Sequence, residues 1–345
     1  MSNKMLISGG GGFIGYHCAR FFSKKGLQVV VLDNLSRKGS AYNMELLKRD
    51  FPITHCAADV RDAEQVSEVF RKEGPFSTII HLAAQVAVTT SVVNPREDFM
   101  TNALGTMNML EGFRTCSPEA LFIYASTNKV YGNLSDFTMV ELDKRFIIGD
   151  FRGVNEGRGL DFHSPYGCSK GCADQYVIDY ARIYGLRSMS FRQSCIYGDQ
   201  QFGVEDQGWV AWFIIAASLG IPLTIYGNGK QIRDILYIDD LLTLYELAIK
   251  NGSAMRGEGF NIGGGIENTM SPLELIDVLR EEGLDVQYRH EDWRPGDQRV
   301  FYSDNDKAAV MLGWKPRIVP REGIRKVIFW VRENRGLLRK MLASK

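Results

Sequence analysis

The stretch Gly9-Gly-Gly-Gly12-Phe-Ile-Gly15 follows a short apolar run, Met5-Leu-Ile7, and precedes a helix-like segment that ends near Lys25. Glycines at these three spaced positions permit a tight turn, close approach of the backbone to a pyrophosphate, and close packing of helix on strand. A helix that begins here presents free N–H groups to phosphate oxygens. The stretch therefore predicts a dinucleotide-binding loop between a first strand and a first helix.

Strand-like and helix-like segments alternate outward from this loop. The strand-like runs are apolar throughout, which is typical of strands covered on both faces. Their alternation with helices predicts an α/β fold with a doubly wound parallel (Rossmann) sheet. We expect strands at 5–7, 29–32, 53–56, 78–82, 121–124 and 187–191, and helices at 13–25, 62–72, 99–114 and 166–184.

After Arg192 the pattern changes to mixed helices, short strands and glycine turns. We expect a dinucleotide-binding domain over 1–192 and a smaller mixed α/β lobe over 193–345 that binds mainly the substrate. Some segments of this C-terminal lobe are expected to return to the sheet.

An acid, Asp33, ends the second predicted strand. There it can accept hydrogen bonds from an adenosine ribose, which favours NAD and repels a 2′-phosphate. Arg37 and Lys38 lie close by and leave NADP open. Asp59 ends the next strand, where it either touches the adenine or caps the following helix.

Tyr166 and Lys170 lie four residues apart on a predicted helix. Residues at this spacing share one helix face. A neighbouring ammonium stabilises a phenolate, so we expect the pKa of Tyr166 to be lowered towards the range of a general base. A surface tyrosine near a lysine has the same spacing. The dinucleotide loop upstream favours the hydride-transfer interpretation, because oxidation of an alcohol needs a base opposite a hydride acceptor.

These motifs, taken in order along the chain, resemble those of the extended short-chain dehydrogenase/reductases, a family that acts on nucleotide sugars. The resemblance runs from about Met5 to Trp330. It rests on the glycine loop, Asp33, His81-Leu-Ala-Ala-Gln85, Ser126-Thr-Asn-Lys-Val-Tyr-Gly132 and Tyr166-x-x-x-Lys170.

The resemblance implies a catalytic triad in which Thr127 is the hydroxyl partner, Tyr166 the base and Lys170 its electrostatic support. It implies that NAD is bound by Gly9, Gly12, Phe13, Ile14, Gly15, Asp33, Asn34, Ser36, Arg37, Asp59, Val60, Leu82, Ala83, Ala84, Gln85, Tyr166 and Lys170. It further implies that a nucleotide-diphosphate sugar contacts Gln85, Thr127, Asn128, Gln193, Cys195, Gln201, Arg233, Arg294 and Asp297.

Several of these roles have alternatives. Arg233 and Arg294 suit phosphate oxygens because the guanidinium fork binds them in pairs, yet each has an aspartate close by with which it can form an ion pair instead. Trp209 is a candidate for the sugar pocket or for plain core. Lys129 either lines the pocket or faces solvent.

Two features distinguish branches of the family. Dehydratases resemble Thr-Asp-Glu at the triad hydroxyl, whereas this chain has Thr127-Asn128-Lys129, without an acid. That argues against 4,6-dehydration. Narrower runs resemble the nucleotide-sugar 2-epimerases: Asp33-Asn-Leu-Ser-Arg-Lys-Gly39, Leu160-Asp-Phe-His-Ser-Pro-Tyr-Gly-Cys-Ser-Lys-Gly171, Gln207-Gly-Trp-Val-Ala-Trp-Phe213 and Gly227-Asn-Gly-Lys-Gln-Ile-Arg-Asp234.

Inversion of a sugar carbon without an acidic hydrogen requires transient oxidation. A ketone at C4 acidifies C3 and C5 but leaves C2 untouched, so a 2-epimerase of this type oxidises C2 itself and returns the hydride to the opposite face. A 4-epimerase or a sugar-nucleotide reductase on the same scaffold is the second hypothesis. A dinucleotide sensor without catalysis is the third, and the complete triad argues against it.

Composition limits the other possibilities. Lys plus Arg and Asp plus Glu both number 41 in 345 residues, so no overall charge favours nucleic acid or an anionic membrane. The cysteines and histidines lack metal-site spacing, so we expect reduced thiols and no metal. The uncharged segment 207–229 is broken at Gly220-Ile-Pro222, which predicts a buried helix and a short strand rather than a membrane span.

The glycine loop begins within ten residues of Met1, so we expect no signal peptide and a cytoplasmic enzyme. The resemblance also implies a role in polysaccharide biosynthesis, such as that of O-antigen. It implies a homo-oligomer, a dimer or a tetramer, formed through the helices near 99–114 and 166–184.

Overall fold

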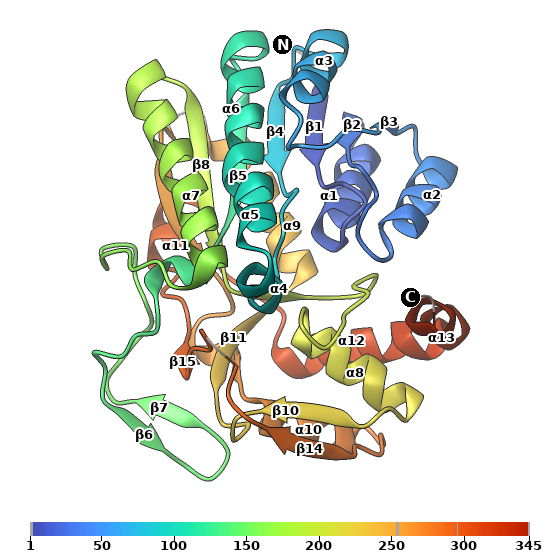
Figure 1. Cartoon of the computed structure of the whole chain (residues 1–345), viewed down its shortest axis with the longest axis vertical. Coiled ribbons are helices and arrows are strands. Elements are labelled where there is room, and N and C mark those ends of the chain that lie inside the picture. Colours follow the sequence, from blue (N-terminus) through green and yellow to red (C-terminus); the bar gives the residue numbers. More distant parts are fainter. Residues whose placement is uncertain (1–2, 253–254, 295, 344–345) are drawn as a thin grey trace.

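Seven parallel strands form the central sheet in the computed structural model, which describes residues 3–252, 255–294 and 296–343 (Figure 1). The strand order is β12-β8-β5-β4-β1-β2-β3, and each neighbouring pair is parallel. The prediction of a doubly wound parallel sheet is confirmed. The strands are β1 (Lys4–Ser8), β2 (Gln28–Leu32), β3 (Thr54–Cys56), β4 (Thr78–His81), β5 (Leu121–Thr127), β8 (Arg187–Gln193) and β12 (Glu258–Ile262).

Helices cover both faces of this sheet, which explains why its strands are apolar throughout (Figure 1). Leu6 and Phe122 belong to the core under α3, α6 and α7, whereas Ile7 and Ile123 belong to the core on the other face, with α1 and α9. The helices are α1 (Phe13–Lys24), α3 (Ala63–Glu73), α6 (Gly105–Cys116), α7 (Ser164–Tyr184), α9 (Ile238–Asn251) and α11 (Asp306–Leu312).

Three helical segments differ from the sequence-based prediction. Helices α2 (Ser40–Asp50) and α4 (Val88–Val93) were not predicted. The helix expected over 99–114 begins earlier, as α5 (Pro95–Phe99), and passes through a wider helical turn, η1 (Met100–Leu104), before α6. In this wider turn the Asn102 side chain donates a hydrogen bond of 3.0 Å to Ser169 of α7.

The C-terminal lobe lies below the sheet in Figure 1. One of its sheets contains β9 (Cys195–Tyr197), β11 (Ile232–Tyr237), β13 (Thr269–Met270) and β15 (Val300–Phe301), and another pairs β10 (Leu223–Tyr226) with β14 (Tyr288–Glu291). Its helices are α8 (Trp209–Leu219), α10 (Pro272–Glu281), α12 (Pro320–Glu333) and α13 (Arg335–Ala343), with the short turn η4 (Ile266–Asn268).

Segments cross between the two halves of the chain. Strand β12 belongs to the later half but pairs with β8 in the central sheet. The hairpin of β6 (Met139–Glu141) and β7 (Phe146–Ile148) belongs to the earlier half, yet Phe146 N–H donates to the carbonyl of Lys230 in the lobe at 2.8 Å.

The uncharged segment 207–229 forms the buried helix α8 followed by β10, as predicted. Among the described residues, no helix is both long and apolar enough to cross a membrane. The six cysteines are free thiols. Over the same part of the chain, no three His, Cys, Asp or Glu side chains cluster so as to hold a metal ion.

Candidate active site

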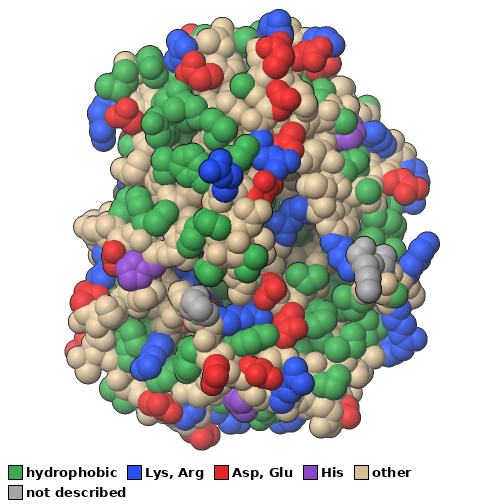
Figure 2. All heavy atoms as spheres, viewed as in Figure 1, with side chains coloured by type: hydrophobic (Ala, Val, Ile, Leu, Met, Phe, Trp, Pro, Cys, Tyr) green, Lys and Arg blue, Asp and Glu red, His purple; other side chains and the backbone are tan. Residues whose placement is uncertain are grey.

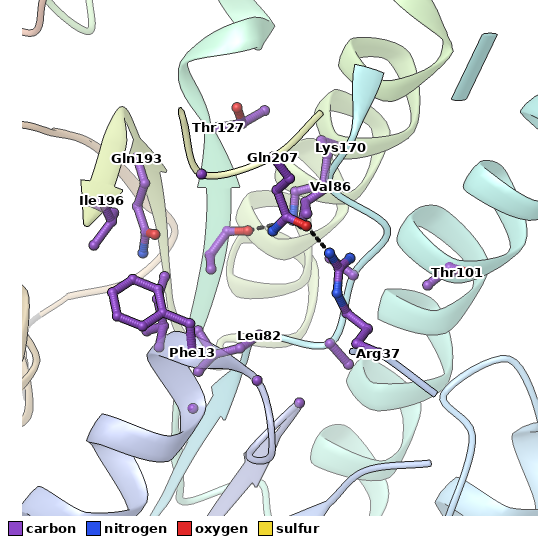
Figure 3. Close-up of a pocket in the computed structure, with 18 of the residues that line it drawn as sticks. Phe13, Arg37, Leu82, Val86, Thr101, Thr127, Lys170, Gln193, Ile196 and Gln207 are labelled. Carbon is purple, nitrogen blue, oxygen red and sulfur yellow. Dashed lines mark hydrogen bonds between the residues drawn. The ribbon is translucent and has the colours of Figure 1, made fainter. Parts of the chain in front are cut away.

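A cavity of about 420 Å³ lies at the carboxyl ends of the parallel strands, where doubly wound sheets bind ligands. Its walls come from the turns after β1 to β5 and β8, from the start of α7, and from the segment before α8 (Figure 3). Figure 2 shows the surface hollowed between the sheet and the C-terminal lobe, with Lys and Arg side chains around the hollow.

The glycine loop forms one wall. Gly9 has φ +72°, and a Cβ there would lie 2.7 Å from the backbone nitrogen of Ala83. A Cβ on Gly15 would collide with the carbonyl oxygen of Gly9. Gly12 begins α1 without a side-chain cap, and the first turn carries no acid. The N–H groups at this helix start are therefore available to an anion, and Phe13, Ile14 and Gly15 line the cavity as predicted.

Asp33 stands at the end of β2, as predicted, and lines the cavity. Its carboxylate also orders the loops around it, because it accepts hydrogen bonds from Gly11 N–H at 2.8 Å and Leu35 N–H at 2.7 Å. Asn34, Ser36 and Arg37 follow it along the cavity wall. The structure thus brings this predicted group together.

Asp59 and Val60 extend the same wall at the end of β3. The alternative of a helix cap at Asp59 is wrong, because Asp62 caps α3 by accepting from the N–H groups of residues 64 and 65. Hydrogen bonds from Arg61, and to a lesser degree from Asn34, lower the pKa of Asp59 to about 2. Sequence reasoning missed Arg61, which also lines the cavity; an arginine two residues after the acid was the available signal.

Gln85 differs from the prediction. Leu82, Ala83 and Ala84 line the cavity, but Gln85 does not belong to its wall. Its amide nitrogen donates to the carbonyl of Ala87 and to Asp98 Oδ1, both at 2.8 Å. The side chain therefore turns away from the cavity and helps to hold the turn after β4.

The three triad residues line the cavity together. Thr127 ends β5, and its side chain lies close enough to the phenol of Tyr166 to act on the pKa of that group. Tyr166 and Lys170 occupy successive turns of α7, whose first turn contains Pro165. Lys170 Nζ donates to the carbonyl of Ala125 at 2.5 Å and lies 4.2 Å from the centre of the Tyr124 ring. Figure 3 shows Thr127 and Lys170 on these two elements.

Burial controls the titration of this pair. It raises the pKa of Tyr166 to about 12, which the side chain of Thr127 and the charge of Arg37 oppose. It lowers the pKa of Lys170 to about 7, against the charges of Asp174 and Asp98. The expectation of a lowered pKa for Tyr166 is therefore wrong for the protein alone. The low-dielectric surroundings of the Tyr166 phenol raise its pKa by more than the ammonium of Lys170 lowers it.

The opposite wall comes from the turn after β5 and from the C-terminal half of the chain. Asn128, Lys129, Gln193, Cys195, Gln201 and Trp209 line it. Gln193 donates to the hydroxyl of Tyr245 at 3.0 Å, and Asn128 donates to Gln298 Oε1 at 3.0 Å. Lys129 therefore lines the cavity, and Trp209 both lines the cavity and packs against the main core.

Arg233, Arg294 and Asp297 stand outside this wall. Arg233 donates to the carbonyls of Ile232 at 2.8 Å and Gln298 at 2.7 Å. Arg294 forms an ion pair of 2.9 Å with Asp206 and lies 3.5 Å from the centre of the Tyr226 ring. Among the described residues, the alternative ion pairs with Asp234 and Asp297 therefore do not form, although Arg294 pairs with a more distant aspartate.

One cross-lobe contact was not predicted. Arg37, from the loop after β2, donates to the side-chain amide oxygen of Gln207, which lies just before α8. Both residues line the cavity, and Figure 3 shows their side chains pointing toward one another across it. No sequence spacing connects positions 170 residues apart, so this contact has no signal in a single chain.

The residues present fit a dinucleotide. The loop at Gly9 and Gly15 leaves no room for a side chain, the start of α1 offers N–H groups for phosphates, and Asp33 offers carboxylate oxygens for ribose hydroxyls. Tyr166 and Lys170 stand in the same cavity, where a hydride acceptor and a sugar alcohol would meet.

Comparisons with known proteins agree with this geometry. A family model described as GDP-mannose 4,6-dehydratase matches residues 6–327. The CDP-paratose 2-epimerase of Salmonella typhi is 44% identical over 336 residues, covering 95% of this chain and 98% of the Salmonella protein.

Solved structures are similar over almost their full length. The dTDP-glucose 4,6-dehydratase of Streptomyces venezuelae, with NAD and TYD bound, has a TM-score of 0.84 at 27% identity, covering 98% of this chain and 99% of that one. The UDP-glucose 4-epimerase of Thermus thermophilus, in complex with NAD, has a TM-score of 0.80 at 28% identity, covering 95% and 99%.

Proposed function

The chain belongs to the GDP-mannose 4,6-dehydratase family of extended short-chain dehydrogenase/reductases, and we propose that it is an NAD-dependent nucleotide-sugar 2-epimerase. The substrate we propose is CDP-paratose, with CDP-tyvelose as the product. The observation that carries this choice is the 44% identity to a CDP-paratose 2-epimerase over 95% of the chain. The triad in one cavity supports oxidation of a sugar alcohol.

Absence of an acid after Thr127 supports epimerisation over dehydration. Asn128 and Lys129 follow it, and both line the cavity. Neither side chain is a carboxylate, so this turn offers no carboxylate to take part in the loss of water from a keto sugar.

The chain's own groups can move the proton of the sugar alcohol. A bound NAD, held by the glycine loop, the start of α1 and Asp33, would supply the acceptor and donor for the hydride of C2. Thr127 holds the C2 oxygen, and Tyr166 takes its proton and later gives it back. Lys170 stabilises the phenolate, since a buried phenol with a pKa near 12 needs positive charge to ionise at neutral pH.

Proton NMR of the purified protein with CDP-paratose in D₂O, without added NAD, tests this proposal. We expect the 2-epimer to appear without deuterium at C2, because a retained dinucleotide returns the same hydride. Deuterium at C2 would support the 2-epimerase function but contradict hydride return, because the C2 hydrogen would then come from solvent. Lack of conversion, in protein that contains NAD, would reject this substrate.

We also propose a homo-oligomer formed through α6 and α7. These helices pack side by side on one face of the molecule (Figure 1). Ile183 and Tyr184 near the end of α7 are 64% and 50% exposed, which leaves an apolar surface suited to a second copy. Light scattering after size exclusion should give a dimer or tetramer, and Ile183→Asp should shift it towards the monomer.

A cytoplasmic role in polysaccharide biosynthesis, such as that of O-antigen, remains part of the proposal. The similarity to a Salmonella typhi epimerase that acts on a CDP-sugar supports it.

A further inference from the structure

Lys129 brings a positive charge beside the triad. It stands two residues after Thr127, in the helical turn η2 (Asn128–Tyr131), and its backbone N–H donates to Thr127 Oγ1 at 3.3 Å. The side chain is half-buried and lines the same cavity as Thr127 and Tyr166. Its ammonium donates to the carbonyl oxygen of Gly296 at 3.0 Å.

A second cation lies near it. Burial, and after it the positive charge of Arg233, lowers the pKa of Lys129 to about 8, and the charge of Asp297 opposes this shift. In the part of the chain that the structure describes, neither cation forms an ion pair; both donate to neutral backbone carbonyls. Lys129 lines the cavity, so its ammonium can form a charge-assisted hydrogen bond with an anion there, whereas Arg233 stands outside the cavity wall and contributes only its charge.

The covalent structure of a nucleotide sugar decides where its phosphate can lie. The diphosphate is attached to C1, and C2 is bonded directly to C1. If the C2 hydroxyl meets Tyr166, the sugar-bound phosphate lies beside the same phenol. If the C4 hydroxyl meets Tyr166, the phosphate points away, across the ring. A cation two residues from Thr127 fits the first arrangement.

We propose that Lys129 binds the phosphate attached to C1 and thereby presents C2, rather than C4, to Tyr166. This inference rests on the proposed function and makes Lys129 the residue that determines which carbon reacts.

The test compares two ligands that differ by one phosphate. Dissociation constants for CDP and CMP are measured by calorimetry on the full chain with NAD bound, for the wild type and Lys129→Gln. We expect CDP to bind about tenfold more weakly to the variant, with CMP within about twofold, because a charge-assisted hydrogen bond to the terminal phosphate is lost. Lys129→Arg should recover most of the CDP affinity, and the KM for CDP-paratose should follow the CDP result.

Lys307→Gln is the matched control. Lys307 also donates to a backbone carbonyl, that of Gly259 at 2.8 Å, but lies outside the cavity wall. It should leave both dissociation constants unchanged. If Lys129→Gln does not retain bound NAD or the circular dichroism spectrum of the wild type, Lys129→Met is measured in its place.

The outcomes separate this inference from the proposed function. Equal weakening of CDP and CMP, or weakening of neither, would overturn the phosphate contact even if the wild type epimerises C2. Selective weakening of CDP in a protein whose wild type inverts C4 instead would overturn the assignment to C2. Selective weakening together with C2 epimerisation supports both.

Discussion

The ammonium of Lys170 and the carbonyl oxygen of Ala125 lie 2.5 Å apart, which holds a buried charge against the last residues of β5. The contact fixes the lysine one helical turn from Tyr166. Burial, by contrast, makes Lys170 costly to protonate, since the residue is only 3% exposed.

Lys170 should make stability depend on pH in the cofactor-free protein. Its pKa is about 7 when folded and 10.5 for the unperturbed group, so between these values the unfolded chain binds more protons. The free energy of unfolding should therefore rise with pH across this window, by at most about 1.4 kcal/mol per unit from this group. Urea titrations at pH 7 and 9.5 should show a larger rise for the wild type than for Lys170→Met. Equal slopes would contradict the buried titration.

Tyr166→Phe should remove turnover and leave the fold intact. The phenyl ring keeps the buried packing at this position but cannot take a proton, so we expect a loss of roughly 10²–10⁴-fold in the epimerisation rate. NAD content, measured after acid release, should equal that of the wild type. Full activity in the variant would contradict the assignment of Tyr166 as the general base.

Asp33→Ser should weaken NAD binding by about tenfold, because ribose hydroxyls lose a charged acceptor. Binding of NADP relative to NAD should improve, since the carboxylate that repels a 2′-phosphate is gone and Arg37 stays nearby. Fluorescence titration of apoprotein with each dinucleotide measures both changes. In this variant the N–H groups of Gly11 and Leu35 also lose their acceptor. The melting temperature is therefore measured as a control.

Arg192→Met should destabilise the fold by about 3–5 kcal/mol, because it leaves the carboxylate of Asp174 buried and unpaired. The two side chains are 7% and 0% exposed and meet at 3.0 Å between β8 and α7. Arg182→Met is the matched control within α7: its pair with Asp179 is largely exposed, so the loss should stay below about 1 kcal/mol. Urea unfolding measures both, and equal losses would contradict this assignment.

The local motifs of the fold could be predicted because they depend on neighbours in sequence. The glycine loop, Asp33 and the Tyr166–Lys170 pair each follow from a turn, a strand end or one helix face. Helix α2 was missed although its buried residues Asn43, Met44 and Leu47 follow a helical period, because the segment is short and mostly polar.

The rest of the site depends on contacts between distant segments. The Gln85 amide donates to Asp98, and the Arg294 guanidinium pairs with Asp206. Nothing in the sequence around Gln85 or Arg294 indicates these partners. The pKa of Tyr166 likewise reflects how completely the fold encloses the phenol, which residue spacing does not report.

The hydrogen bond between Arg37 and Gln207 ties the two halves of the chain together across the cavity. If a dinucleotide leaves the glycine loop past Arg37 and Gln207, its release requires this hydrogen bond to break. Release of the dinucleotide and release of the sugar product are then separate events with separate barriers. A reaction that regenerates its oxidant in every cycle can then turn over many times while the same dinucleotide stays bound.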